Sequence, residues 1–299
     1  MRKFRLPKPS GGYREIWALN RKEKAAYRAL IPPLTALCQK LDVHGVMHGF
    51  MPGRSPVTNA MAHVGDWEYT VSFDLKDFFD SVDAKHFFRI ESDTLKELNG
   101  IIFGKGCLPT KQGLPTSPVL ANIAFANADW KMMRVAKNVD HRFVYTRYAD
   151  DMTFSVLTKS HADYLIECVP SAIHVEGFEV NPKKTRVQWR KVGRREITGL
   201  MVDRHGVYPT RETRKRLRAA RHQNNLSQLA GLEEWCRLRM PGGGVSMRAR
   251  IKSYRRAWDR ASRGGNTVQL LHEENLLKVA AYQHGLDPDE VMRRAHEKI

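Results

Sequence analysis

The stretch Arg147-Tyr148-Ala149-Asp150-Asp151-Met152-Thr153-Phe154-Ser155 carries two adjacent carboxylates. The β-branched and aromatic residues 143–146 before it, and the alternating residues 152–156 after it, predict two strands. The simplest geometry is a hairpin whose tight turn carries Asp150 and Asp151. Two unpaired carboxylates repel each other, and a hard cation such as Mg²⁺ would remove that cost. A solvated Asp-Asp turn is the alternative when the pair is taken alone.

The composition predicts a protein that binds nucleic acid. The 299 residues carry a formal net charge of +18, which attracts polyanions over long range. An anionic membrane surface is the competing partner, but the sequence has no apolar run of about 18 residues that could span a bilayer. No apolar stretch follows the basic residues 1–5, so we expect no signal peptide. The four cysteines lack metal or redox spacing and are expected to be reduced packing residues of a cytoplasmic protein.

The N-terminal region predicts a basic hairpin followed by helices. Ser10-Gly11-Gly12 is a turn sequence, residues 13–19 can return as a strand, and Lys8 and Arg14 then lie near its mouth. Such cations could hold a triphosphate, although an ordinary basic surface hairpin has the same pattern. Residues 21–39 predict a helix that is interrupted at Pro32-Pro33.

A second loop-to-helix segment covers residues 44–63. Ser55 or Thr58 could cap the helix. Asn59 and His63 are four residues apart and would share one helix face. Such a polar pair either bonds to a neighbouring loop or serves a ligand, and both interpretations stay open.

Asp74 follows an apolar segment, residues 69–73, that predicts a buried strand. The end of a strand is where sheets with helical cover commonly place chemistry, and a partly buried carboxylate needs a partner. Residues 85–99 predict an amphipathic helix. The loop 112–118 opens a long helix over 119–135, with Pro118 in its first turn, and this junction could offer backbone N–H groups to an anion.

The remaining chain predicts further hairpins and then basic helices. A helix over 161–172 precedes a turn that presents Lys183 and Lys184, and residues 196–202 with 206–208 form a second hairpin candidate. Residues 211–221 predict a basic helix, and residues 211–299 hold 19 Lys and Arg against 10 Asp and Glu. Interleaved basic and aromatic residues suit RNA backbone contacts and base stacking, with a solvated basic face as the alternative.

The order of these features favours phosphoryl transfer. Two-metal chemistry needs carboxylates from separate elements that converge on ions about 4 Å apart, and Asp74 and Asp150 could supply them. One ion would lower the pKa of a primer hydroxyl, while the other would hold a triphosphate and the leaving pyrophosphate.

The series resembles reverse transcriptases, and among them bacterial retron reverse transcriptases, from about Lys8 to Tyr208. The matching motifs are Gly11-Gly12-Tyr13-Arg14, His48-Gly49-Phe50, Phe73-Asp74-Leu75-Lys76-Asp77-Phe78-Phe79, Gln112 to Pro118, Tyr148-Ala149-Asp150-Asp151 and Asn181-Pro182-Lys183-Lys184-Thr185. Two marks point to retrons: Asn59-Ala60-Met61-Ala62-His63 fits an Asn-Ala-x-x-His pattern, and Ile197-Thr198-Gly199 stands where that family usually has Val-Thr-Gly.

This resemblance implies an α+β fold of the right-hand polymerase type. Residues 1–68 would form the N-terminal part of the fingers. Residues 69–209 would form a palm of antiparallel sheet plus helices, with inserted fingers elements around 85–115. Residues 210–299 would form a helical, basic, RNA-binding thumb.

The resemblance also implies site residues. Asp74, Asp150 and Asp151 would be catalytic and would hold two Mg²⁺ ions together with the backbone carbonyl of Leu75. Asp74 and Asp150 would be the direct ligands, and Asp151 a supporting carboxylate. The residues expected to bind the dNTP are Lys8, Arg14, Phe79 as the steric gate against a ribose 2′-OH, Gln112 and Lys184. The residues expected to contact RNA or primer are Arg54, Asn59, His63, Gly199, Arg211, Arg214, Lys215, Arg218, Arg248, Lys252, Tyr254 and Arg255.

The implied function is RNA-directed DNA synthesis in a retron. Such an enzyme reverse transcribes part of its own structured non-coding RNA from an RNA 2′-OH, which gives a branched RNA-linked DNA (msDNA), and serves anti-phage defence with an effector protein of the same operon. The expected partners are this RNA, its RNA–DNA product, dNTPs and the effector, with no membrane. Two alternatives stay open: a group II intron or diversity-generating reverse transcriptase, and a non-catalytic RNA-binding scaffold that restrains a partner effector.

Overall fold

The computed structural model describes residues 2–7, 11–87, 90, 110–237, 247–263, 274, 277 and 288–296. Lys8, most of the helix predicted over 85–99, and the predicted loop at 241–244 lie outside the described residues. In the described part of the chain the cysteines Cys38, Cys168 and Cys236 are free. No helix there has the length and apolar character needed to cross a bilayer.

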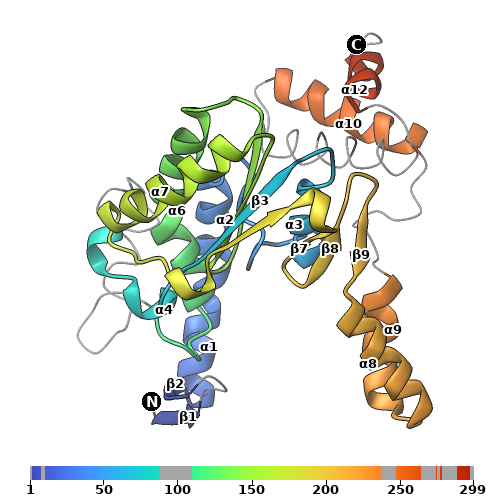
Figure 1. Ribbon diagram of the computed structural model, residues 1–299. Helices are drawn as coiled ribbons and strands as arrows, with labels where there is room; N and C mark the ends of the chain where they lie inside the picture. Colours follow the sequence, from blue (N-terminus) through green and yellow to red (C-terminus); the bar gives the residue numbers. More distant parts are fainter. Residues whose placement is uncertain are drawn as a thin grey trace.

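A four-stranded antiparallel sheet forms the centre of the molecule (Figure 1), in the order β4-β5-β3-β6. Its strands are β3 (Tyr69–Asp74), β4 (Phe143–Tyr148), β5 (Asp151–Val156) and β6 (Arg186–Trp189). The long helices α6 (Ser117–Lys137) and α7 (Lys159–Val175) lie together on one side of this sheet. Phe73, Phe154 and Phe125 are at most 1% exposed in the shared core. The predicted antiparallel sheet with covering helices is therefore confirmed.

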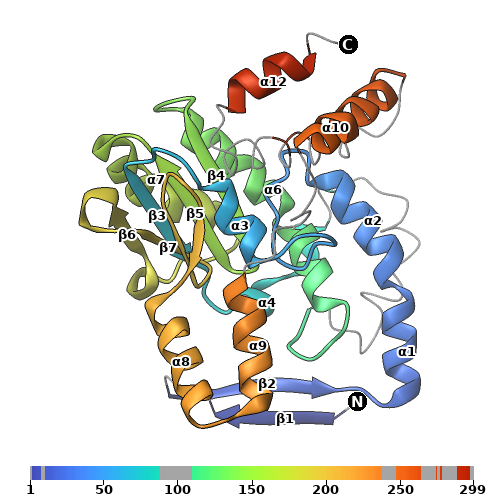
Figure 2. The same cartoon turned by 90° about the vertical axis from the view of Figure 1, so that its right-hand side faces the viewer.

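The N-terminal elements extend away from this sheet (Figure 2). Strands β1 (Arg2–Pro7) and β2 (Tyr13–Ala18) form a separate hairpin, which helices α1 (Arg21–Ala29) and α2 (Ile31–Leu41) connect to the body. The predicted helix break falls at Leu30, and the two prolines lie in the first turn of α2. Proline is tolerated there because the N–H that it lacks would have no partner within the helix.

A small second sheet packs on α3 (Pro56–Ala62). It contains β7 (Arg195–Ile197), β8 (Leu200–Val202) and β9 (Val207–Pro209). Apolar side chains of α3 share one buried cluster with apolar side chains of β7 and β8. Residues 196–202 with 206–208, expected to form a hairpin, form two hairpins: β7 turns into β8 at Thr198 and Gly199, with φ values of 45° and 75°, and β8 pairs with β9. Two left-handed residues in a two-residue turn are typical of tight hairpins.

Short elements connect the main ones. Helix α4 (Phe78–Ser81) follows β3, and the 3-10 turns η1 (Ala84–His86), η2 (Pro182–Lys184) and η3 (Arg190–Val192) follow later in the chain. Asp83 is the N-cap residue of η1.

Helices occupy the described residues after Pro209, as the sequence predicted. Helices α8 (Arg211–His222) and α9 (Leu226–Arg237) form one pair, and α10 (Met247–Ser262) and α12 (Pro288–His296) lie at the other end of the molecule in both views (Figures 1 and 2). A small core that includes Tyr254, Val291 and Ala295 joins α10 to α12. The division at residues 68 and 209 stays a prediction.

Candidate active site

Three aspartates meet at one end of the central sheet. Asp74 is the last residue of β3 and lies opposite Asp151, the first residue of β5. Asp150 lies in the turn before β5, and its carbonyl accepts a hydrogen bond of 3.0 Å from the backbone N–H of Leu75. The expected convergence of Asp74 with the Asp150-Asp151 pair is thus present in the fold, and the catalytic role of the three residues stays a prediction.

The turn that carries Asp150 differs by one residue from the prediction. Tyr148 pairs with Asp151, so the two turn residues are Ala149 and Asp150, and Asp151 belongs to the strand. Ala149 has a φ of 57°, a left-handed conformation that costs a residue with a Cβ about 1–2 kcal/mol. Such strain persists where the surroundings hold the backbone in place.

One source of that restraint is the loop that contains Gly49. A Cβ at Gly49 would lie 2.3 Å from the backbone nitrogen of Ala149, which is too close for any side chain. The backbone N–H of His48 donates to the carbonyl of Arg147 at 2.7 Å. The segment 48–50 is therefore packed directly against the aspartate turn.

A buried ion pair also contacts the turn formed by Ala149 and Asp150. Arg147 is fully buried, and its Nε and Nη2 donate to the carboxylate of Asp129 on α6 at 2.7–3.2 Å. Its Nη1 donates to Oδ1 of Asn122 at 2.8 Å and to the carbonyl of Ala149 at 3.1 Å. Sequence reasoning gave Arg147 no role. The only available signal was an acidic residue, Asp129, inside a helix of mostly apolar residues.

Burial and neighbouring negative charge raise the pKa values of Asp150 and Asp151. Burial, followed by the charges of Asp150 and Asp74, raises the pKa of Asp151 to about 6. Burial and Asp74 also raise the pKa of Asp150, against the opposing effect of Lys184 and Arg14. A carboxylate pair that resists ionisation would gain from a bound cation.

Lys184 provides a nearby positive charge. Its Nζ lies 2.8 Å from Oδ1 of Asp74, and this hydrogen bond is the main cause that raises its pKa. The backbone fixes this arrangement, because the N–H of Asn181, which caps η2, donates to the carbonyl of Asp74 at 2.7 Å. Lys184 therefore lies beside the aspartates, and its expected contact with a nucleotide stays a prediction.

The residues expected around a nucleotide come from three elements. Gln112 accepts a backbone hydrogen bond of 2.8 Å from Trp17 of β2. A Cβ at Gly113 would lie 2.3 Å from the carbonyl of Trp17, so this loop is closely packed on the hairpin that carries Arg14. The ring of Phe79 is half-buried beside the core. Arg14 is exposed and lowers the pKa of Asp150 through its charge.

Two of the residues expected to contact RNA are internal instead. His63 is fully buried, and its ring nitrogens bond to Ser155 Oγ at 2.8 Å and Thr146 Oγ1 at 2.7 Å. Asn59 is 1% exposed, and its Nδ2 lies 3.4 Å from Thr198 Oγ1 in the turn between β7 and β8. An RNA contact for either side chain is therefore wrong, because neither reaches the surface. The pair instead joins α3 to the central sheet and to the β7–β8 turn.

Three further expected RNA contacts are also used within the fold. Arg54 donates to Asp42 and to two carbonyls of its own loop. Tyr254 is fully buried and bonds to His296 at 2.8 Å, so it cannot stack on a base. Arg255 donates to the carbonyls of Arg294 and Ala295 at the end of α12. For Arg54, Tyr254 and Arg255 the structure shows packing and capping roles.

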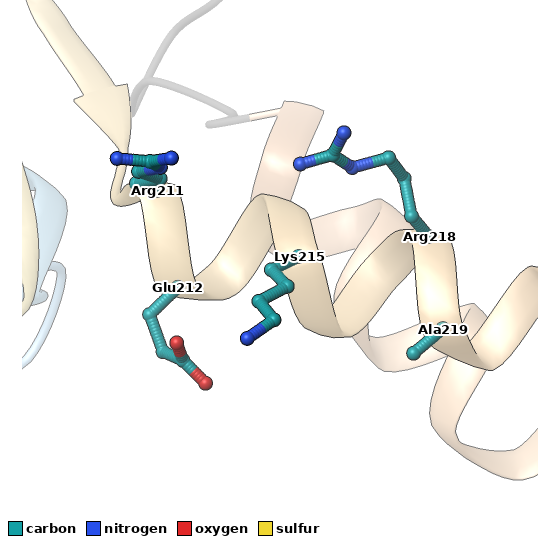
Figure 3. A pocket seen from close by; sticks show the side chains of 5 residues that line it. All are labelled: Arg211, Glu212, Lys215, Arg218 and Ala219. Atoms are coloured by element: carbon teal, nitrogen blue, oxygen red, sulfur yellow. The ribbon is translucent and has the colours of Figure 1, made fainter.

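The basic residues of α8 that are expected to contact RNA lie at the surface. Arg211, Arg214, Lys215 and Arg218 are all exposed, and their spacing of three and four residues places them along one side of the helix. Figure 3 shows Arg211, Lys215 and Arg218, which line one pocket together with Glu212 and Ala219. Lys252 of α10 and Gly199 are exposed as well, while Arg248 lies on α10 and its side chain is outside the described ones.

The chain is similar in sequence to known reverse transcriptases. Residues 6–202 match the family model described as reverse transcriptase (RNA-dependent DNA polymerase). The chain is 37% identical over 250 residues to the retron Mx65 reverse transcriptase of Myxococcus xanthus, covering 75% of this chain and 56% of that protein. It is 31% identical over 220 residues to the retron Ec73 reverse transcriptase of Escherichia coli, covering 67% of this chain and 68% of that protein. The chain thus spans little more than half the length of the Mx65 protein.

Among solved structures, the apo telomerase of Candida tropicalis, truncated from its C-terminal domain, is similar in fold. The TM-score is 0.51 at 15% identity, and the match covers 70% of this chain and 54% of that chain. The shared architecture is the right-hand polymerase fold that the sequence predicted.

Proposed function

The chain belongs to the reverse transcriptase family, and from this premise we propose that it is the RNA-directed DNA polymerase of a retron. It would copy part of its own structured non-coding RNA into a branched, RNA-linked single-stranded DNA, starting from an RNA 2′-OH. Together with an effector protein it would serve anti-phage defence. The observation that supports polymerisation best is the convergence of Asp74, Asp150 and Asp151 at one end of the central sheet.

Reverse transcriptases depend on divalent metal, and the donor atoms here suit Mg²⁺. No group of three or more His, Cys, Asp or Glu side chains in the described ranges is already arranged to hold an ion. Mg²⁺ does not need such a group, since it keeps several waters and takes further oxygens from substrate phosphates. The pKa values of Asp150 and Asp151 are raised, so a bound cation would stabilise the ionised form of both carboxylates.

We assign two ions to Asp74, Asp150 and the carbonyl of Leu75, with Asp151 in support. When bound, such ions lower the pKa of an attacking hydroxyl and neutralise the charge that develops on the phosphates. Asp74 would exchange its contact with Lys184 for the metal. The ammonium of Lys184 would then be free to face the triphosphate.

The fingers hairpin would supply the other side of the nucleotide site. Arg14 is exposed on β2, and the loop of Gln112 is bonded to the same strand, so both side chains would approach a nucleotide together. Guanidinium groups bind phosphate oxygens through several charge-assisted hydrogen bonds. Phe79 would exclude a ribose 2′-OH. Lys8 would assist Arg14, although its position is outside the described residues.

The basic face of α8 would hold the backbone of the RNA–DNA product. Arg211, Arg214, Lys215 and Arg218 are exposed along one side of the helix, and contacts to phosphates give affinity without reading sequence. Arg248 and Lys252 on α10 would add contacts at the other end of the molecule. The exposed Gly199 turn would lie against the primer strand.

A double substitution of the aspartates tests the proposal. Asp150→Asn with Asp151→Asn protein, expressed with its native RNA, should retain RNA but carry no linked DNA when the co-purified nucleic acid is sequenced. Asp163→Asn is a matched control, because Asp163 is an exposed carboxylate on α7 that pairs only with Lys159 in the described contacts. If the double variant still carries RNA-linked DNA, polymerisation is not the work of this protein. Bound RNA without any DNA in the unsubstituted protein would favour a scaffold.

A second test concerns the choice of sugar. Phe79→Ala should admit ribonucleotides in primer extension, because the side chain that blocks the 2′-OH is removed. Unchanged selectivity between dNTPs and rNTPs would remove Phe79 from this role.

A further inference from the structure

Phe50 combines two features that are unusual for a bulky apolar residue. Its side chain is 45% exposed, and its backbone has a φ of 60°. The left-handed region is disfavoured for residues with a large side chain. A phenylalanine in this conformation at the surface is therefore expected to be held by its neighbours and to serve a purpose there.

The loop that presents Phe50 is firmly clamped. The buried carboxylate of Asp42 accepts backbone N–H bonds from Val46 and Met47 at 2.8 and 3.2 Å. The same carboxylate pairs with Arg54 Nη1 at 2.6 Å, and this nitrogen also donates to the carbonyls of Gly45 and Met47. The loop 42–54 is thus closed at its base, so that the position of Phe50 is fixed.

The clamped loop lies between the aspartate turn and Phe79. On one side, Gly49 packs against Ala149 with no room for a Cβ, and the Asn122 side chain holds the Gly49 carbonyl at 2.8 Å. On the other side, the ring of Phe50 meets the ring of Phe79, with centroids 6.1 Å apart and an interplanar angle of 43°. One short segment therefore contacts both the aspartate turn and Phe79.

Phe79 also contacts other residues that fix its position. Its ring contacts Phe78 with centroids 5.8 Å apart, and its carbonyl accepts a hydrogen bond from Thr110. Phe78 is buried, whereas Phe50 is exposed. Of the two rings that contact Phe79 in the described residues, the Phe50 ring is therefore the one exposed to solvent.

We propose that Phe50 is a positioning residue for sugar selection, which holds the Phe79 ring where it excludes the 2′-OH of a ribonucleoside triphosphate. The inference rests on the proposed polymerase function and on Phe79 as the gate. Without the Phe50 ring, the Phe79 side chain can turn toward the vacated space, and the sugar pocket gains room for a hydroxyl. The contact that carries this role is the one between the two rings.

The experiment compares the ratio of kcat/KM for a dNTP and the matching rNTP in primer extension on an RNA template. Phe50→Ala and Phe50→Gly should lower this ratio by about tenfold or more, since small displacements of a positioned group have effects of this order. Phe50→Gly is the sharper variant, because glycine adopts the left-handed conformation freely and relieves backbone strain. Its protein should be at least as stable as the parent and yet less selective.

Two controls separate the ring from general effects. Phe50→Tyr keeps the ring and should retain the parental ratio. Trp189→Ala removes an aromatic side chain of similar exposure, 41%. Trp189 ends β6 and pairs with Tyr69, at the opposite end of β3 from Asp74. This variant should also leave the ratio unchanged.

Different results would overturn different claims. If Phe79→Ala loses selectivity while both Phe50→Ala and Phe50→Gly keep it, the inference is wrong and the proposed function stands. Equal losses of dNTP and rNTP incorporation in the Phe50 variants would show a structural role only and would also refute it. If the parent protein extends no primer under any condition, the proposed function and the inference fail together.

Discussion

The buried pair of Arg147 and Asp129 offers a test that separates stability from activity. Asp129 accepts hydrogen bonds from Arg147 and, at 2.6 Å, from the hydroxyl of Tyr145. Arg147 also reaches past Asp129 to the Ala149 carbonyl in the aspartate turn. The informative variants are Asp129→Leu alone, Arg147→Met alone, and the two together.

Each single variant should be strongly destabilised. Asp129→Leu leaves a fully buried guanidinium without its counter-charge, which costs about 3–5 kcal/mol. The loss of the acceptor for Tyr145 adds about 1 kcal/mol. For a folding unit of about 200 residues, this corresponds to a fall in Tm of roughly 10 °C or more.

The double variant should recover stability but not activity. Apolar residues of similar volume often replace a buried ion pair at little cost, so thermal denaturation should return to within a few degrees of the parent. Methionine cannot donate to Ala149 or Asn122, so primer extension should remain about tenfold or more below the parent. Full recovery of both properties would refute the claim that Arg147 supports the turn. The control is the exposed pair Lys159 and Asp163, whose disruption should cost less than about 1 kcal/mol.

Three further perturbations address other parts of the site. In metal-free protein, the raised pKa of Asp151 means that the folded state binds the proton of this carboxyl more tightly than the unfolded state does. The free energy of unfolding should therefore fall as pH rises from about 4 through about 6. Asp151→Asn should flatten this slope in denaturant titrations, and an unchanged slope would exclude Asp151 as its source. Gly49→Ala should lower both Tm and primer extension, because its Cβ would lie 2.3 Å from the Ala149 nitrogen; Gly231→Ala, with nothing within 4 Å, is the control and should be neutral or slightly stabilising. Arg218→Ala should weaken binding of any RNA duplex and lower the slope of log affinity against log salt by about one; an effect confined to one RNA sequence would argue against a backbone contact.

The sequence predicted the parts of the fold where local patterns are strong. The alternation over residues 152–156 and the apolar run before Asp74 identified two strands that do pair, in a register that brings Asp74 opposite Asp151. The long helix over 119–135 and the basic helix over 211–221 were also found, with small differences at their ends. Each of these elements has a periodic pattern and a clear start or stop residue.

Residues whose roles depend on tertiary packing could not be predicted. Asn59 lies in α3 and His63 is the C-cap residue of this helix, and spacing alone cannot show that both side chains point into the protein. The same holds for Tyr254, which has the interleaved pattern of a base-stacking residue and yet fills a small core between α10 and α12. The role of Arg147 depends on Asp129 and Asn122, which lie on another element. No local pattern contains both halves of such a contact.

The charges of the molecule pose a problem that the site arrangement resolves. The net charge of +18 attracts nucleic acid over long range, yet the reaction centre proposed here consists of three carboxylates that would repel a triphosphate. Lys184 neutralises Asp74 directly, and Arg14 acts on Asp150 from the hairpin. These two cations cannot balance three carboxylates and an incoming triphosphate, so further positive charge must arrive with the substrate. At the proposed site, divalent metal ions bound together with the nucleotide would meet this requirement.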